Sequence, residues 1–258
     1  LKQTVDLTKP LKMLDLCAAP GGKSTHIHSL ISGDSLLVSN EVIRSRANIL
    51  KDNIIKWGCE NAVVTNNDPR DFARLENYFD VIVIDAPCSG SGLFRRDPEA
   101  INEWSENNVQ LCSQRQQRIL ADVWPALKKN GILIYSTCSY SKEEDEDIAD
   151  WLLHEFAVDY SSLTIHPDWG IVDTGKGYRF WPDRVKGEGF FLSVFRKAEG
   201  DDDAVAKTRN TIERVTKKEM EVIDRWVKKE NRVFVKNENT VYAWPEKLQG
   251  DLDFLLKQ

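Results

Sequence analysis

Short apolar runs alternate along the first part of the chain with longer stretches in which apolar residues recur every three or four positions. Short runs are typical of buried strands, and the wider spacing is typical of amphipathic helices. Their alternation predicts an α/β fold, in which crossover helices join the strands of a mainly parallel sheet. The predicted strands are residues 12–17, 35–41, 62–67, 79–85 and 131–137, and the predicted helices are residues 22–32, 43–57, 105–129 and 142–156.

Local signals refine two of these helices and add a late strand. Pro125 should kink or divide the third helix, because proline lacks an amide donor and clashes one turn back. Ser141 and Glu144 have the spacing of a capping box, and we expect the acidic residues 143–147 to face water. Residues 187–196 alternate like an antiparallel strand, with a partner expected near residues 160–166.

The composition changes near residue 199, where small and acidic residues indicate a linker. We predict a main domain over residues 1–198 and a small α+β extension over residues 199–258. Within the extension, the pattern predicts a helix over 216–230 and a hairpin with strands at 232–235 and 240–244.

Composition and charge limit the possible partners. No apolar run approaches the length of a membrane span and no signal peptide is visible, so we expect a soluble, cytoplasmic protein. The five cysteines contain no C-x-x-C pair, which predicts reduced thiols and no metal site. The net charge of −6 requires any nucleic acid to meet a local basic patch. Because the chain starts with Leu1 close to the first strand, we expect natural sequence upstream.

Two cysteines, Cys88 and Cys138, each lie just past an apolar strand-like run. The carboxyl ends of neighbouring strands line the ligand crevice of an open α/β sheet, so we expect both thiols to face one reacting atom. A free cysteine is most often a small buried hydrophobe. Two thiols at strand ends instead favour catalysis.

The first predicted strand leads into a turn over residues 17–24, Cys-Ala-Ala-Pro-Gly-Gly-Lys-Ser, which can bring backbone close to a polar cofactor. A P-loop requires glycine at position 17, which is cysteine, and no G-x-G-x-x-G fingerprint is present. An ATP-hydrolysing or nicotinamide-dependent enzyme is therefore disfavoured. Glu41 and Asp68 end the next two strands, where carboxylates can bind a ribose and reach an adenine. Taken alone, each carboxylate is explained as a solvated strand end or a helix cap. Taken together, they favour an adenosine cofactor, and we predict S-adenosyl-L-methionine.

Three motifs carry a resemblance to a known family. With Cys-Ala-Ala-Pro-Gly-Gly-Lys-Ser at 17–24, Asp-Ala-Pro-Cys-Ser-Gly-Ser-Gly at 85–92 and Ser-Thr-Cys-Ser-Tyr-Ser at 136–141, the chain resembles Sun/Fmu RNA cytosine carbon-5 methyltransferases. The resemblance implies a Rossmann-like methyltransferase fold and methylation of cytosine in small-subunit ribosomal RNA through a covalent cysteine intermediate. It is greatest to bacterial members with a C-terminal RNA-binding extension, whereas the family's upstream RNA-binding part has no counterpart here.

The resemblance also implies individual roles. Cys138 is the nucleophile, Cys88 assists product release, and Asp85 lies near both cofactor and base. DNA cytosine methyltransferases use a Pro-Cys thiol placed like Cys88, so chemistry alone leaves the two roles open. The residues implied to bind S-adenosyl-L-methionine are Cys17, Ala18, Ala19, Pro20, Gly21, Gly22, Lys23, Glu41, Asp68 and Asp85.

Arg95 and Arg96 follow the Cys88 loop, and we predict that they contact RNA phosphates beside a flipped base. The alternative for both is a surface salt bridge with Asp97 or Glu99. A second function is also possible: a non-catalytic RNA-binding or ribosome-assembly factor that retains the fold. The complete cysteine pair argues against it.

Overall fold

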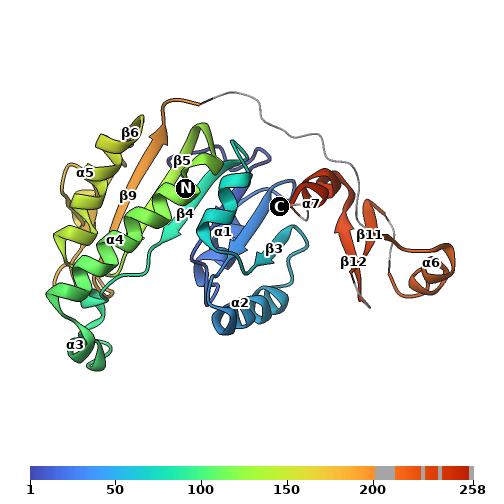
Figure 1. Ribbon diagram of the computed structural model, residues 1–258, viewed down its shortest axis with the longest axis horizontal. Coiled ribbons are helices and arrows are strands. Elements are labelled where there is room, and N and C mark those ends of the chain that lie inside the picture. The colour runs from blue at the N-terminus through green and yellow to red at the C-terminus, as the bar shows by residue number, and fades with distance from the viewer. Residues whose placement is uncertain (201–212, 228–229, 238–239, 256–258) are drawn as a thin grey trace.

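The computed structural model describes residues 1–200, 213–227, 230–237 and 240–255, and it consists of a central sheet with helices on both faces (Figure 1). The strands of this sheet are β1 (Lys12–Asp15), β2 (Leu36–Asn40), β3 (Ala62–Thr65), β4 (Phe79–Asp85), β5 (Leu127–Thr137), β6 (Val158–Tyr160), β7 (Val172–Asp173), β8 (Tyr178–Phe180) and β9 (Phe190–Lys197). Three further strands lie in the C-terminal extension: β10 (Glu213–Arg214), β11 (Arg232–Asn237) and β12 (Thr240–Pro245).

The α-helices are α1 (Gly22–Leu30), α2 (Arg44–Trp57), α3 (Glu99–Glu103), α4 (Glu106–Val123), α5 (Glu146–Glu155), α6 (Lys217–Ile223) and α7 (Gln249–Leu255). Short 3-10 helices connect several elements: η1 (Pro69–Arg74), η2 (Ser91–Leu93), η3 (Trp124–Ala126), η4 (Lys142–Glu144), η5 (Pro167–Trp169) and η6 (Glu246–Leu248).

The main sheet has the order β3-β2-β1-β4-β5-β9-β8-β7, with β6 also paired to β9. Strands β1 to β5 are parallel, and β9 runs antiparallel to both β5 and β6. This is a Rossmann-like methyltransferase fold, which confirms the predicted fold class. The predicted partner of the late strand near residues 160–166 corresponds to β6, which pairs with residues 195–197 of β9, while β8 pairs with residues 190–192 of the same strand. The parallel order places the ends of β1, β4 and β5 side by side.

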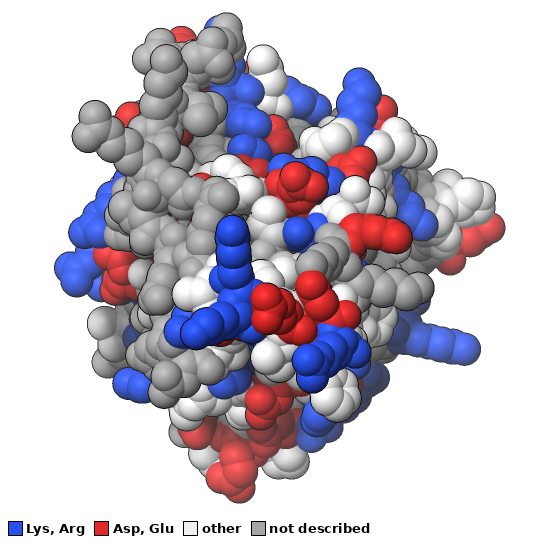
Figure 2. Space-filling model, turned by 90° about the vertical axis from the view of Figure 1, so that its right-hand side faces the viewer, with Lys and Arg blue, Asp and Glu red and all other residues white. Residues whose placement is uncertain are grey.

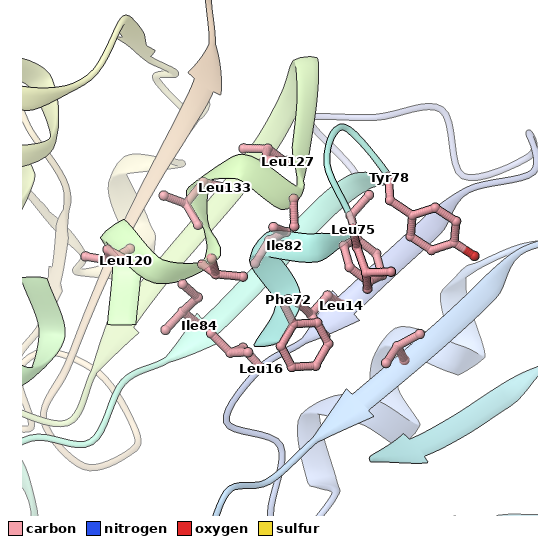
Figure 3. Packing of buried hydrophobic residues seen from close by; sticks show 14 of the residues in the cluster. Leu14, Leu16, Phe72, Leu75, Tyr78, Ile82, Ile84, Leu120, Leu127 and Leu133 are labelled. Carbon is pink, nitrogen blue, oxygen red and sulfur yellow. The ribbon is translucent and has the colours of Figure 1, made fainter. Parts of the chain in front are cut away.

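The two faces of the sheet belong to different apolar clusters because successive strand residues point to opposite sides. Leu14 and Ile82 pack toward α4 on one face, where Leu120 and Leu133 join them (Figure 3). Met13 and Val81 pack with Ile27 of α1 on the other face. Burying a leucine or isoleucine side chain contributes about 1.5–3 kcal/mol, so these layers hold the strand ends rigidly.

The third predicted helix ends earlier than expected. Helix α4 stops at Val123, and Pro125 lies in η3, so the prediction of a helix to residue 129 is wrong. Proline cannot supply the next amide, and β5 already begins at Leu127. The buried ammonium group of Lys197 donates to the carbonyl oxygens of Trp124 (3.2 Å) and Leu127 (2.7 Å), which satisfies two acceptors in the connection between α4 and β5.

The C-terminal extension contains a three-stranded sheet, β10-β11-β12, with α6 and α7. The predicted hairpin corresponds to β11 and β12, while its residues 238–239 lie outside the described residues. The predicted helix over 216–230 is α6 only to Ile223, and 228–229 are likewise outside the description. The predicted domain boundary adjoins residues 201–212, which the structure does not describe, and it stays a prediction.

Helix α7 packs against the edge of the main sheet domain near Tyr78. The Phe254 ring lies 5.0 Å from that of Tyr78, and the Tyr78 hydroxyl donates to Asp251 (2.8 Å), which also pairs with Lys12 (2.6 Å). The connection from β3 to β4 contains η1 in place of a longer crossover helix, and Leu255 lines one small cavity together with Phe72 of η1. Helix α7 therefore covers sheet surface that this short connection leaves open.

On the face of the molecule that carries the C-terminal extension, basic and acidic side chains of the described residues are interspersed (Figure 2). Several are ion-paired, including Arg232 with Glu60 (2.9 Å) and Lys236 with Glu219 (2.9 Å). Ion pairs at a solvated surface contribute little to stability, because water competes for both charges. Within the described residues, every helix is too short or too polar to span a membrane.

Candidate active site at the strand ends

The structure brings Cys88 and Cys138 together. Asp85 at the end of β4 pairs in register with Ser136 of β5, and the loops after these strands carry the two thiols. Their sulfur atoms lie 3.2 Å apart, and both side chains are half-buried. One small reactant at this edge of the sheet can therefore reach both sulfurs.

The contact makes the two thiols chemically different. The two sulfurs share a hydrogen bond that either can donate; when Cys88 donates, it lowers the pKa of Cys138, although burial and the charge of Asp85 act in the opposite direction. The same hydrogen bond, together with burial, raises the pKa of Cys88. These opposite directions favour Cys138 as the thiolate of the pair and Cys88 as its hydrogen-bond donor.

Asp85 links the thiols to the turn after β1. Its Oδ2 atom accepts from the Lys23 ammonium group (2.7 Å), and its Oδ1 atom accepts from the Ser136 hydroxyl (2.8 Å). The Lys23 ammonium also lies 5.4 Å from the centre of the Phe190 ring. Two predicted site residues from distant motifs, Lys23 and Asp85, are thus in direct contact.

Helix α2 holds the predicted cofactor turn in place. Arg46 donates to the Ala19 carbonyl oxygen (3.0 Å), and Asn53 donates to that of Pro20 (2.7 Å). Gly21 has a φ of +114°, and a Cβ there would lie 3.2 Å from Leu50. Glycine allows the chain to turn at this point into the first turn of α1, whose first amide groups receive no side-chain cap from Gly21.

Glu41 and Asp68 lie at the ends of β2 and β3, as the sequence placed them. The Glu41 carboxylate is buried and accepts from the Ile43 amide (3.0 Å), with Arg46 at 3.4 Å. Asp68 caps η1 by accepting from the Arg70 amide (3.2 Å). Asp68 therefore has the alternative role of a helix cap, and cofactor contacts by either residue stay a prediction.

Asp15 is a buried site residue that the sequence motifs do not indicate. This carboxylate at the end of β1 is fully buried, and its Oδ2 atom accepts from the Ser24 hydroxyl (2.6 Å). Among the residues that the structure describes, its Oδ1 atom has no hydrogen-bond partner, and neither has the buried Ser39 hydroxyl on β2. Burial raises the pKa of Asp15 to about 6, and the charges of Asp85 and Glu41 act in the same direction. The available signal was an acidic residue within an apolar strand.

We predict that Asp15→Asn stabilises the ligand-free protein at neutral pH. The folded-state pKa of about 6 exceeds the usual 3.8, so protonated Asp15 favours folding below pH 3.8 and this contribution disappears as the pH rises through 6. At pH 7 the free energy of unfolding of Asp15→Asn should therefore exceed that of wild type by at most about 3 kcal/mol. Urea unfolding at pH 4 and pH 7 measures it, with exposed Asp52→Asn as control. Equal effects of Asp15→Asn at both pH values would contradict the prediction.

Two acidic residues near the thiols are buried, so the expectation that residues 143–147 face water is wrong for them. Glu144 and Asp145 are fully buried, and within the described part of the chain the Ser141 side chain makes no capping hydrogen bond. Thr137 donates to Asp145 (2.5 Å), and Arg179 forms an ion pair with it (3.1 Å). Buried carboxylates are tolerated when such donors surround them, and a linear motif does not show donors from other loops.

The basic residues after the Cys88 loop lie at the surface. Arg95 donates to the Gly187 carbonyl oxygen (2.6 Å) and pairs with Glu188 (3.2 Å), instead of the Asp97 or Glu99 considered above. Arg96 is exposed. RNA contact by Arg95 and Arg96 stays a prediction. Among the described residues, no group of three His, Cys, Asp or Glu side chains is arranged to hold a metal ion.

Sequence comparisons with known proteins point to one family. A family model described as "16S rRNA methyltransferase RsmB/F" matches residues 3–196. Ribosomal RNA small subunit methyltransferase F of Shewanella sediminis is 38% identical over 190 residues, which cover 72% of this chain and 40% of that protein. The same enzyme of Shewanella piezotolerans is 31% identical over 240 residues, which cover 90% of this chain and 51% of that protein. The chain thus spans about half or less of these curated relatives.

Solved structures show the same fold. NSun6 from Pyrococcus horikoshii, described as "with SFG", has a TM-score of 0.66 and 27% identity, covering 74% of this chain and 48% of that one. A methyltransferase homolog protein from the same organism has a TM-score of 0.64 and 28% identity, covering 74% and 63%. The resemblance to Sun/Fmu enzymes is thereby confirmed, and the chain belongs to the RsmB/F family of 16S rRNA methyltransferases.

Proposed function

We propose that this protein methylates carbon 5 of cytosine in RNA, with S-adenosyl-L-methionine as methyl donor and small-subunit ribosomal RNA as substrate. The observation that carries the proposal is the contact between the two thiols, whose sulfur atoms lie 3.2 Å apart. They lie at the ends of β4 and β5, where Asp85 also accepts a hydrogen bond from Lys23 of the turn after β1. The relatives named as small-subunit ribosomal RNA methyltransferases support the substrate class.

The turn after β1 has the polar groups that the cofactor requires. The unpartnered Asp15 oxygen offers a buried acceptor and the first amides of α1 offer donors, which fits the ammonium and carboxylate of an amino-acid moiety. Residues 17–23 then surround that moiety, Glu41 binds the ribose, and Asp68 lies at the adenine. When bound, S-adenosyl-L-methionine supplies an electrophilic methyl group.

Covalent catalysis explains why a low-pKa thiol is needed. Carbon 5 of cytosine is a poor nucleophile, so the Cys138 thiolate first adds to carbon 6, and the ring electrons become available at carbon 5. We assign Asp85 to the ring nitrogen N3, where a shared proton stabilises the charge that develops during addition. The hydrogen bond from Cys88 favours the thiolate that starts the reaction.

Product release requires a base. The carbon-5 proton must leave so that the bond between carbon 6 and the Cys138 sulfur can break and restore the aromatic ring. We assign this proton to Cys88, which first loses its own proton to water once the Cys138 sulfur is bonded to the base. After this step Cys88 again carries a proton and Cys138 is again a thiolate, as at the start of the reaction.

The test uses RNA that carries tritium at carbon 5 of cytosine, incubated with the protein and S-adenosyl-L-methionine. The expected result is release of one tritium to water for each methyl group transferred. Methyl transfer without tritium release would place the methyl group elsewhere on the RNA. RNA binding with neither transfer nor release would favour the alternative of a non-catalytic ribosome-assembly factor.

A further inference from the structure

We infer that Glu144 is a positioning residue that holds the Cys88 and Cys138 loops at a fixed separation. Its carboxylate lies between the two loops and is fully buried. The inference deepens the proposed function, and its consequence for catalysis rests on that function. Its geometric part does not, because the separation of two thiols can be measured without RNA.

The carboxylate binds the residue that follows each thiol. Its Oε1 atom accepts from the backbone amide of Ser89 (2.7 Å), and its Oε2 atom accepts from the Ser89 hydroxyl (2.5 Å). The same Oε2 atom accepts from the Ser139 hydroxyl (2.6 Å). Because Ser89 follows Cys88 and Ser139 follows Cys138, one side chain connects both thiol loops.

Other contacts fix Glu144 itself, so its carboxylate can set the positions of the two thiol loops. Its carbonyl oxygen accepts from the hydroxyl of buried Tyr135 (2.7 Å), which fixes it to β5. The Gln116 amide group of α4 donates to its Oε1 atom (3.3 Å) and also to the Pro87 carbonyl oxygen (3.0 Å). The carboxylate therefore connects the thiol loops to the rigid core.

Charge makes these hydrogen bonds strong. A carboxylate that accepts several hydrogen bonds in a buried site binds each donor about twice as strongly as a neutral acceptor does. Removing it leaves Ser89 and Ser139 without their acceptor, and each loop must move or admit water to satisfy its donors. The thiols are one residue away and must move with them.

Other contacts keep the loops folded when the carboxylate is absent. The Gly92 amide donates to the Cys138 carbonyl oxygen (2.9 Å), and the Tyr140 amide donates to the Ser91 hydroxyl (2.8 Å). The two loops therefore stay attached at these points. Loss of the Glu144 carboxylate is expected to shift the thiols rather than to unfold the site.

Glu144→Ala and Glu144→Gln separate positioning from simple burial. In Glu144→Gln the amide oxygen still accepts from the Ser89 amide, and the amide nitrogen donates to serine hydroxyls, which can also accept. We expect Glu144→Gln to keep kcat within about threefold of wild type, and Glu144→Ala to lower it about a hundredfold, because a misplaced reacting group costs about that much. Binding of S-adenosylhomocysteine should change less than about twofold in both variants.

A trivalent arsenical reports the thiol separation directly. Phenylarsine oxide forms two arsenic–sulfur bonds with a pair of adjacent thiols and releases water, so it binds tightly only where both sulfurs are close. We expect wild type and Glu144→Gln to bind it equally, and Glu144→Ala to bind it at least about tenfold more weakly. Cys88→Ala gives the affinity for unpaired thiols, and Glu143→Ala, on the same turn, is the matched control.

The outcomes separate the inference from the proposed function. Wild-type arsenical affinity and wild-type kcat in Glu144→Ala would overturn the inference. Weaker arsenical binding in Glu144→Ala, in a protein that transfers no methyl group, would support the positioning role and reject the proposed reaction. If Glu144→Ala does not fold, Ser89→Ala and Ser139→Ala replace it, and unchanged arsenical binding in both would overturn the inference.

Discussion

Cys138→Ala is expected to lower methyl transfer to RNA by at least about a thousandfold, since no other group replaces a lost covalent nucleophile. Without the thiolate, carbon 6 forms no bond to the protein and carbon 5 remains a poor nucleophile. The predicted cofactor turn follows β1, away from position 138 in the chain, and keeps its contacts with Arg46 and Asn53. S-adenosylhomocysteine should therefore bind Cys138→Ala as it binds wild type.

The measurement combines transfer of a labelled methyl group to RNA with calorimetry of S-adenosylhomocysteine. Cys59→Ala is the matched control, because it removes a half-buried thiol outside the site and should leave both values unchanged. Activity that survives in Cys138→Ala and is lost in Cys88→Ala would reverse the two roles. That result would agree with the Pro-Cys alternative considered from the sequence.

The main sheet was predictable because parallel strands buried on both faces read as continuous apolar runs. Residues 79–85 and 36–40 illustrate this, since their central side chains are almost entirely buried. The end of α4 was less predictable. Proline at position 125 was seen to interrupt the helix, but the start of β5 at Leu127 depends on pairing with Phe79, which a local pattern does not contain.

The contact between the two thiols followed from chain order, since β4 and β5 are neighbours and each precedes a cysteine. The polar residues that hold the two thiol loops in place could not be predicted from the order of the strands. Glu144 reads as a member of an acidic, helix-capping run, and its burial depends on Ser89 and Gln116 from distant segments. The packing of α7 likewise depends on Tyr78, more than 150 residues earlier in the chain.

Replacement of Cys88 is expected to trap the covalent complex between protein and RNA. Without Cys88 the carbon-5 proton has no assigned acceptor, so the bond between carbon 6 and the Cys138 sulfur persists after methylation. We expect a gel-shifted, denaturant-stable adduct in Cys88→Ala and turnover reduced by about a hundredfold or more, the usual contribution of a general base. Wild type should show little adduct under the same conditions.

Serine at position 88 separates the two functions of this thiol. Because the Cys88 hydrogen bond lowers the pKa of Cys138, Cys88→Ala should form its adduct slowly at neutral pH and faster as the pH rises through the higher pKa of Cys138. In Cys88→Ser the hydroxyl still donates to Cys138 but is a far weaker acid than a thiol, so it provides no comparable base. The adduct should then form at the wild-type rate and still accumulate. Equal adduct rates for Cys88→Ala and Cys88→Ser at every pH would show that the hydrogen bond does not activate Cys138, and rapid turnover without adduct in both variants would exclude Cys88 from product release.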